Sequence, residues 1–218
     1  MPSSFTLNFK KTKIYYFHGS FTEKNNDKYL KNAIIVDPAG SAFENANSQY
    51  NQAGLASGAI YKYIGLTGSH SLGKIESGKA KYNNQLDSIQ KEKVAHLIHA
   101  VGPNNGDSKM THEDYKTKLR ETIDNIFTVI KEESNIDEKS KLWIAFYFIS
   151  GGLFKGNSIE LFKENGEDYY FYYLFEKFNQ LAMDNKLPKF PIIFQVFSPD
   201  EQGKFANFIK KNLVTSNL

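Results

Sequence analysis

Small residues and glycines follow two apolar runs of the sequence, at positions where a polar ligand can approach bare backbone. The run at 33–36 ends in Asp37-Pro38-Ala39-Gly40, and the run at 142–149 ends in Ser150-Gly151-Gly152. Backbone N–H groups in glycine-rich turns and at helix N-termini are well suited to bind phosphate groups. Two such turns in one chain therefore predict an anion site built from main-chain atoms.

A third stretch of small residues leads into a helix. Gly54-Leu55-Ala56-Ser57-Gly58 enters the segment 58–64, which has a helical pattern and ends at Gly65, a residue typical of helix C-termini. The dipole of a helix favours negative charge at its N-terminus. We therefore expect this loop to contribute to the same anion site.

Asp37 is the titratable side chain best placed for chemistry. A carboxylate at the end of a buried strand can hydrogen-bond a hydroxyl group of a ligand or activate a water molecule, because burial and neighbours tune its pKa. The alternative is an Asp-Pro turn in which the carboxylate satisfies nearby backbone N–H groups. The residues alone leave both interpretations open.

No metal site and no cofactor are predicted. The chain has no cysteine and five histidines. His96 and His99 stand three residues apart in an apolar run, so in a strand they point to opposite faces and cannot share one ion. We interpret each as a structural histidine with its hydrogen bonds satisfied.

Strands and helices alternate along the chain and would position these residues. The expected strands lie at 13–17, 33–36, 94–101, 142–149 and 191–197, and the expected helices at 58–64, after a cap at Thr111, at 167–185 and after Ser198. Such alternation predicts a mostly parallel sheet covered on both faces, with ligands binding at the carboxyl ends of its strands. We expect one domain over 1–218, with a polar insertion around 66–93.

Composition limits the partners of the chain. The net charge is +3, the lysines are scattered, and Arg120 is the only arginine, which argues against nucleic acid and leaves phosphate recognition to the backbone. The apolar runs are far shorter than the ~20 residues that cross a bilayer, and no apolar stretch follows the early lysines, so we expect no membrane span and no signal peptide. The sequence favours a cytoplasmic protein, or one delivered to a host cytosol if its source is an intracellular pathogen; it leaves the oligomeric state open.

The order of these segments resembles the macrodomain family. That family combines an Asn-Ala-Ala-Asn strand end, a glycine loop leading into Gly-Ala-Ile, a His-x-Val-Gly-Pro strand and a Ser-x-Gly-Ile-Phe/Tyr-Gly loop. The similar stretches here lie at 45–60, 99–103 and 150–156, and 13–22 looks like the opening strand of the family. The resemblance implies a three-layer α/β/α sandwich with a mostly parallel mixed sheet and a cleft for ADP-ribose or an ADP-ribosylated protein.

The resemblance also implies which residues line that cleft. Ser20 and Phe21 would lie near the adenine, with Ser20 in place of the family's aspartate. The ribose element fits two registers, either Asp37 to Gly40 with Ala39, or seven residues later with Asn45 and Asn47. We favour the first register, with an inserted loop before Asn45. The diphosphate and its surroundings would be contacted by Gly54, Leu55, Ala56, Ser57, Gly58, Ser150, Gly151, Gly152, Leu153 and Phe154.

Hydrolysis of an ADP-ribosyl linkage is a further implication of the resemblance. Asp37 is the candidate catalytic residue, next to the carbon that a water molecule would attack. Ser57 stands where some members of the family have an aspartate that assists hydrolysis, and Tyr61 stands where some have a histidine. The alternative for the whole chain is a non-catalytic macrodomain-like module that binds nucleic acid or a protein partner.

Overall fold

The computed structural model describes a set of residues on which every structural statement below rests. They are 7–9, 12–18, 20, 22, 30–40, 43, 49–104, 110–133, 136, 142–147, 149, 163–164, 167–168, 173–174, 176–177, 180–181, 192–196, 203 and 207.

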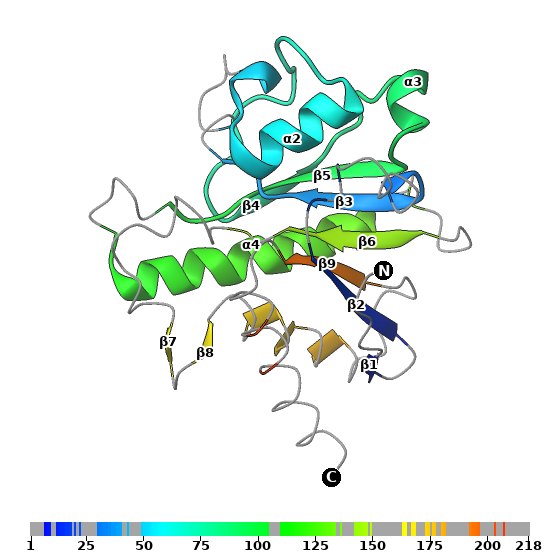
Figure 1. Cartoon of the computed structure of the whole chain (residues 1–218). Coiled ribbons are helices and arrows are strands. Elements are labelled where there is room, and N and C mark those ends of the chain that lie inside the picture. The colour runs from blue at the N-terminus through cyan, green and yellow to red at the C-terminus, as the bar shows by residue number, and fades with distance from the viewer. Residues whose placement is uncertain are drawn as a thin grey trace.

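A seven-stranded mixed sheet forms the centre of the molecule (Figure 1), with strand order β1-β2-β9-β6-β3-β5-β4. The strands are β1 (Leu7–Phe9), β2 (Thr12–His18), β3 (Ala33–Asp37), β4 (Lys79–Tyr82), β5 (His96–Val101), β6 (Trp143–Phe146) and β9 (Ile192–Val196). The neighbours from β2 to β5 all pair in parallel, whereas β1 and β4 pair antiparallel at the two edges. The predicted mostly parallel sheet is confirmed.

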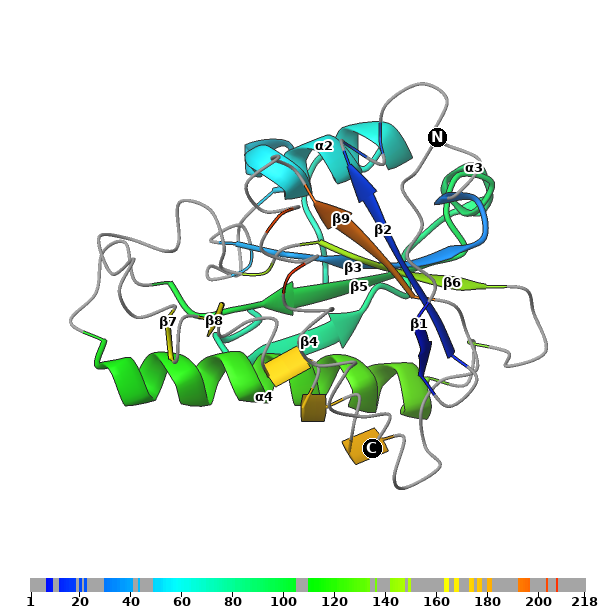
Figure 2. The same cartoon turned by 60° about the horizontal axis from the view of Figure 1, so that its bottom comes forward.

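Helices cover both faces of this sheet (Figures 1 and 2), as expected for a three-layer sandwich. They are the 3₁₀ turn η2 (Tyr50–Gln52), α2 (Leu55–Ile64), α3 (Ser88–Lys91) and α4 (His112–Glu132). Alternate residues of β3 enter different cores, because side chains of a strand point to opposite faces. Ile34 packs in the core with Leu119 of α4, and Ile35 packs in the core with Ile60 of α2.

The ends of α4 follow from its sequence. Thr111 accepts a hydrogen bond from the backbone N–H of Asp114 at 3.2 Å, and Glu113 and Asp114 place negative charge in the first turn, where the helix dipole favours it. The predicted cap is therefore confirmed. The buried hydrophobic residues of α4 keep the three-and-four spacing of a core-facing stripe: Tyr115, Leu119, Ile123, Ile126, Phe127 and Ile130.

The prediction of a helix at 167–185 was wrong for the first residues of that range. Glu167–Asp168 is strand β8, which pairs antiparallel with β7 (Lys163–Glu164). Lys163 is the register partner of Asp168, and Glu164 is the register partner of Glu167. Helical residues are described at 173–174, 176–177 and 180–181.

The polar segment around 66–93 takes part in the fold. It supplies the edge strand β4, the helix α3 and four buried hydrophobic residues of the core beneath α2, which are Leu66, Leu72, Ile75 and Leu86. Its charged and amide side chains are mostly on the surface, as the lysines of β4 illustrate. Within the described part of the chain, no helix combines the length and the hydropathy needed to cross a membrane.

Candidate functional site

The carboxyl ends of β3 and β5 bring Asp37 and His99 together. The two residues are register partners in the parallel pair β3–β5, and the period of a strand turns both toward α2. Both side chains are completely buried. A buried carboxylate is costly unless hydrogen-bond donors surround it, so its partners determine whether this arrangement is stable.

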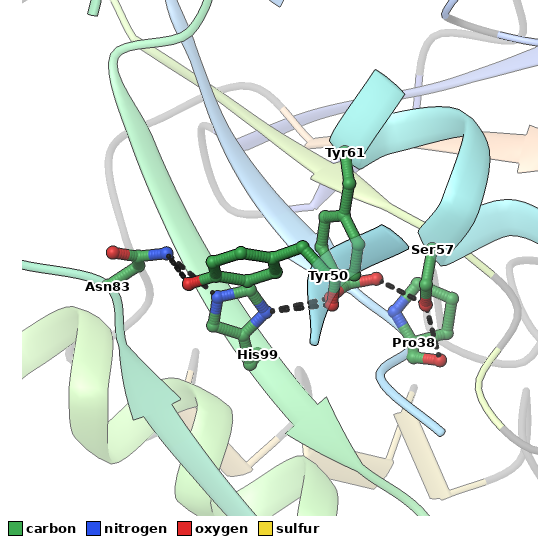
Figure 3. A network of polar contacts seen from close by, with 7 residues as sticks. Pro38, Tyr50, Ser57, Tyr61, Asn83 and His99 are labelled. Carbon is green, nitrogen blue, oxygen red and sulfur yellow. Dashed lines mark hydrogen bonds and ion pairs between the residues drawn. The ribbon is translucent and has the colours of Figure 1, made fainter. Parts of the chain in front are cut away.

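Three donors surround the Asp37 carboxylate, and Figure 3 labels them: Ser57, Tyr61 and His99. The Ser57 hydroxyl donates to Oδ1 at 2.7 Å, and His99 Nδ1 lies 2.8 Å from Oδ2. The Tyr61 hydroxyl also donates to Oδ2. Ser57 and Tyr61 lie one turn apart on α2, so one carboxylate fixes two successive turns of this helix to the end of β3.

The network continues to the opposite side of the imidazole. The amide nitrogen of Asn83 lies 3.0 Å from His99 Nε2 and 3.0 Å from the Tyr50 hydroxyl (Figure 3). Phe43 packs on the same imidazole, with 4.5 Å between ring centroids, and His70 stacks on Phe43 at 4.3 Å. Aromatic packing therefore holds the His99 ring while both of its nitrogens are hydrogen-bonded.

The tyrosines of this network remain protonated at neutral pH. Burial, followed by the charge of Asp37, raises the pKa of the Tyr61 hydroxyl well above its usual value. Burial also raises the pKa of Tyr50 to about 12. Tyr61 is therefore a hydrogen-bond donor to the Asp37 carboxyl group.

Within the part of the chain that the structure describes, no side chain caps the first turn of α2. The first N–H groups of a helix have no acceptor inside it, and the first bond here runs from the N–H of Gly58 to the carbonyl oxygen of Gly54. Gly54 is the N-cap and supplies no capping side chain, and the first turn contains no acidic residue. The main chain of Leu55 to Ser57 can therefore hold an anion.

The backbone conformation at Leu55 and Gly58 makes this turn tight. Leu55 has a φ of 51°, a left-handed value that side chains rarely adopt, and the residues after it are helical. Alternation of left-handed and right-handed residues turns successive N–H groups toward one point, the geometry of an anion-binding nest. Gly58 folds tightly onto the loop, because a Cβ atom there would lie 2.4 Å from the carbonyl oxygen of Ala53.

The strain at Leu55 can be measured. We expect Leu55→Gly to be more stable than Leu55→Ala by about 1 kcal/mol, because glycine alone adopts a left-handed φ without cost. The usual ranking in helices is the reverse, with alanine better by about 1 kcal/mol. The native side chain is 65% exposed and both variants remove it, so their comparison in urea unfolding isolates the backbone. Greater stability of the alanine variant would contradict the strained conformation.

The other predicted site residues are placed as follows. Ala39 is buried and donates its N–H to the carbonyl oxygen of Asp37 at 2.8 Å, and Gly40 beside it is half-buried. Ser20 lies beyond β2 at the same carboxyl edge, half-buried, with its Oγ 2.7 Å from Thr22 Oγ1. The remaining predicted residues lie outside the described part of the chain: Phe21, Asn45, Asn47, Ser150, Gly151, Gly152, Leu153 and Phe154.

Sequence reasoning missed the partners of Asp37. His99 is a buried, hydrogen-bonded histidine as predicted, and His96 is hydrogen-bonded to Tyr82 on the α4 face. The contributions of Tyr61 and Asn83 were not foreseen. Ser57 directly precedes the helix predicted at 58–64, and Tyr61 follows four residues later; this spacing was the available indication that both could meet the same group.

Comparisons with known proteins agree with this architecture. No family model matches the sequence, and no curated protein matches it either. Among solved structures, the chain is similar to the Oceanobacillus iheyensis macrodomain with ADP, with a TM-score of 0.66 and 16% identity over 99% of both chains. It is also similar to the Trypanosoma brucei macrodomain in complex with ADP-ribose, with a TM-score of 0.53 and 17% identity over 90% of this chain and 68% of that one.

A viral structure is similar as well. The alphavirus P23pro-zbd structure matches with a TM-score of 0.58 and 15% identity, covering 92% of this chain and 24% of that one. The chain therefore has the macrodomain fold, as its motif order implied. Identities of this size establish the fold alone.

Proposed function

We propose that this chain binds ADP-ribose, free or attached to a protein, at the carboxyl edge of its sheet. The observation that carries the proposal is the first turn of α2, which lies next to the end of β3 and whose N–H groups no described side chain caps. The macrodomains with the same fold were solved with ADP and with ADP-ribose. A diphosphate supplies the negative charge that such a helix terminus favours.

The composition of the chain is consistent with this mode of binding. With a single arginine in the sequence, bidentate guanidinium contacts cannot dominate phosphate recognition. A main-chain site needs no cation, because the N–H dipoles supply the positive potential. We therefore expect the affinity to depend on the backbone around Gly54 more than on any lysine.

Calorimetry with ADP-ribose, ADP and AMP tests whether the chain binds these ligands. The variant Gly54→Asp tests whether their phosphates bind at the first turn of α2. A Cβ atom at Gly54 has nothing within 4 Å, and its φ of −104° suits any residue, so the new side chain fits. Aspartate would cap the helix and place a negative charge where the phosphate binds. We expect a loss of affinity of about fivefold or more, since two like charges a few ångströms apart repel by at least about 1 kcal/mol.

Two matched variants separate charge from shape. Gly54→Asn introduces the same shape and a similar cap without charge, and should bind better than Gly54→Asp. Ser88→Asp adds the same charge at α3, which leads into the amino end of β5, and should bind like the wild type. Absence of heat with ADP-ribose at millimolar concentration would overturn the proposal. Equal affinities of ADP-ribose for the two Gly54 variants would show that the diphosphate does not bind at this turn.

Hydrolysis of an ADP-ribosyl linkage by Asp37 is the finer part of the proposal. The carboxylate is completely buried and accepts three hydrogen bonds, so at least one donor must move before it can activate a water molecule. The assay is release of ADP-ribose from a modified protein. Asp37→Asn that binds ADP-ribose but releases none would support catalysis by Asp37; an active Asp37→Asn would exclude it.

A further inference from the structure

The orientation of the Asn83 side chain is fixed by its surroundings. Asn83 follows β4 and is completely buried. Its Oδ1 accepts the backbone N–H of Gln85 at 2.9 Å. Because a backbone N–H can only donate, this end of the amide must be the oxygen. The NH₂ group therefore points at the other neighbours, His99 and Tyr50.

The amide in turn determines where the proton of His99 lies. The NH₂ group of Asn83 can only donate, so His99 Nε2, 3.0 Å away, must accept and carries no proton. The proton is then on Nδ1, which donates to Asp37 Oδ2 at 2.8 Å. His99 is thus a neutral imidazole, and the negative charge of Asp37 is not cancelled by a cation at this position.

The charge of Asp37 in turn holds α2. Ser57 and Tyr61 donate to the carboxylate, and hydrogen bonds to a charged acceptor are about twice as strong as neutral ones. Ser57 belongs to the first turn of α2, whose main chain forms the proposed anion site. A continuous series of contacts therefore joins Asn83 to that turn through His99 and Asp37. Figure 3 labels Asn83, His99 and Ser57 along this series.

We propose that Asn83 is a positioning residue for the anion site: by donating to His99 Nε2 it keeps this imidazole neutral and protonated on Nδ1, so that Asp37 holds the first turn of α2 with its full charge. The ligand-binding part of this inference rests on the proposed function. Asn83 acts from the edge-strand side of β5 and, among its described contacts, reaches α2 only through other residues.

Asn83→Asp replaces the amide nitrogen of Asn83, which donates hydrogen bonds, with a carboxylate oxygen, which accepts them. The new carboxylate still accepts from Gln85, and the Tyr50 hydroxyl can donate to it, so the fold has partners for the change. His99 Nε2 would now face an acceptor and take up a proton. The resulting imidazolium pairs with Asp37 and competes with the hydroxyls of Ser57 and Tyr61, which loosens the hold on α2.

Side-chain ¹⁵N NMR of histidine at pH 7 reads the proton positions directly. In the wild type we expect His99 to be protonated on Nδ1 alone, with its signals assigned by their loss in His99→Gln. In Asn83→Asp we expect a proton on Nε2. Tyr50→Phe removes the other acceptor of the Asn83 amide and should leave the proton on Nδ1. A wild-type His99 protonated on Nε2 would overturn the proposal, without need of any variant.

Two further measurements test positioning with and without ligand. The backbone amide signals of residues 55–58 in the free protein should move in Asn83→Asp and stay in place in Tyr50→Phe. The affinity for ADP-ribose should fall at least about fivefold in Asn83→Asp alone, within the usual range of coupling between sites. Unmoved amide signals would overturn the inference. If the wild type fails to bind ADP-ribose while the proton and amide shifts occur as expected, only the proposed function is lost.

Discussion

Replacing Asp37 with alanine is expected to lower the free energy of unfolding by about 3 kcal/mol or more, because three buried donors lose their acceptor together. The substitution leaves the donors of Ser57, Tyr61 and His99 without their acceptor in a site that water does not reach. Each unsatisfied buried group costs about 1–3 kcal/mol. Urea unfolding with an unchanged m-value would measure this loss as a shift of the midpoint.

Asp87→Ala is the matched control for that measurement. Asp87 is an exposed aspartate that caps α3 and accepts the N–H of Gln90 at 2.8 Å, so its loss should cost about 0.5–2 kcal/mol, as for other N-caps. Equal destabilisation by the two substitutions would mean that the carboxylate of Asp37 is not held as the structure indicates.

Gly58→Ala is expected to destabilise the protein by about 1–3 kcal/mol, although alanine is intrinsically the better helix residue by about 1 kcal/mol. The added methyl group would lie 2.4 Å from the carbonyl oxygen of Ala53, so backbone must move. The loop at 53–58 would open, and the affinity for ADP-ribose should fall with the stability. Thermal unfolding and calorimetry on the same variant check both effects.

Gly54→Ala provides the comparison within the same loop. Its methyl group meets nothing within 4 Å, so both stability and affinity should stay close to those of the wild type. A Gly58→Ala protein as stable as Gly54→Ala would show that the loop does not pack against Gly58.

Much of the fold could be predicted because its central strands are continuous apolar runs. Ala33–Asp37 is buried at every residue, as a parallel strand covered on both faces must be. The edge strand β4 was missed because it lacks such an apolar run. Lys79–Tyr82 alternates exposed with half-buried residues and carries two lysines, so its composition resembles a surface loop.

The sequence indicated the local features of the candidate site, whereas the contacts between residues far apart in sequence were missed. The first turn of α2 is one local stretch of small residues, and the general preference of helix N-termini for anions was enough to propose an anion site there. The bond between Ser57 and Asp37 joins residues 20 positions apart, and that between His99 and Asp37 joins residues 62 apart. Those contacts depend on which strands pair and in which register, and periodicity within one strand does not determine this.

The hydrogen bonds around Asp37 also predict how this chain and its relatives diverge. A carboxylate with three buried donors cannot be exchanged alone, so Asp37, Ser57, Tyr61 and His99 should be inherited or replaced together. Residues in direct contact co-vary in this way. Asn83 should join the group as the residue that fixes the imidazole. These five positions then form a signature that can trace descent among macrodomain-fold proteins whose overall identity has fallen to 15–17%.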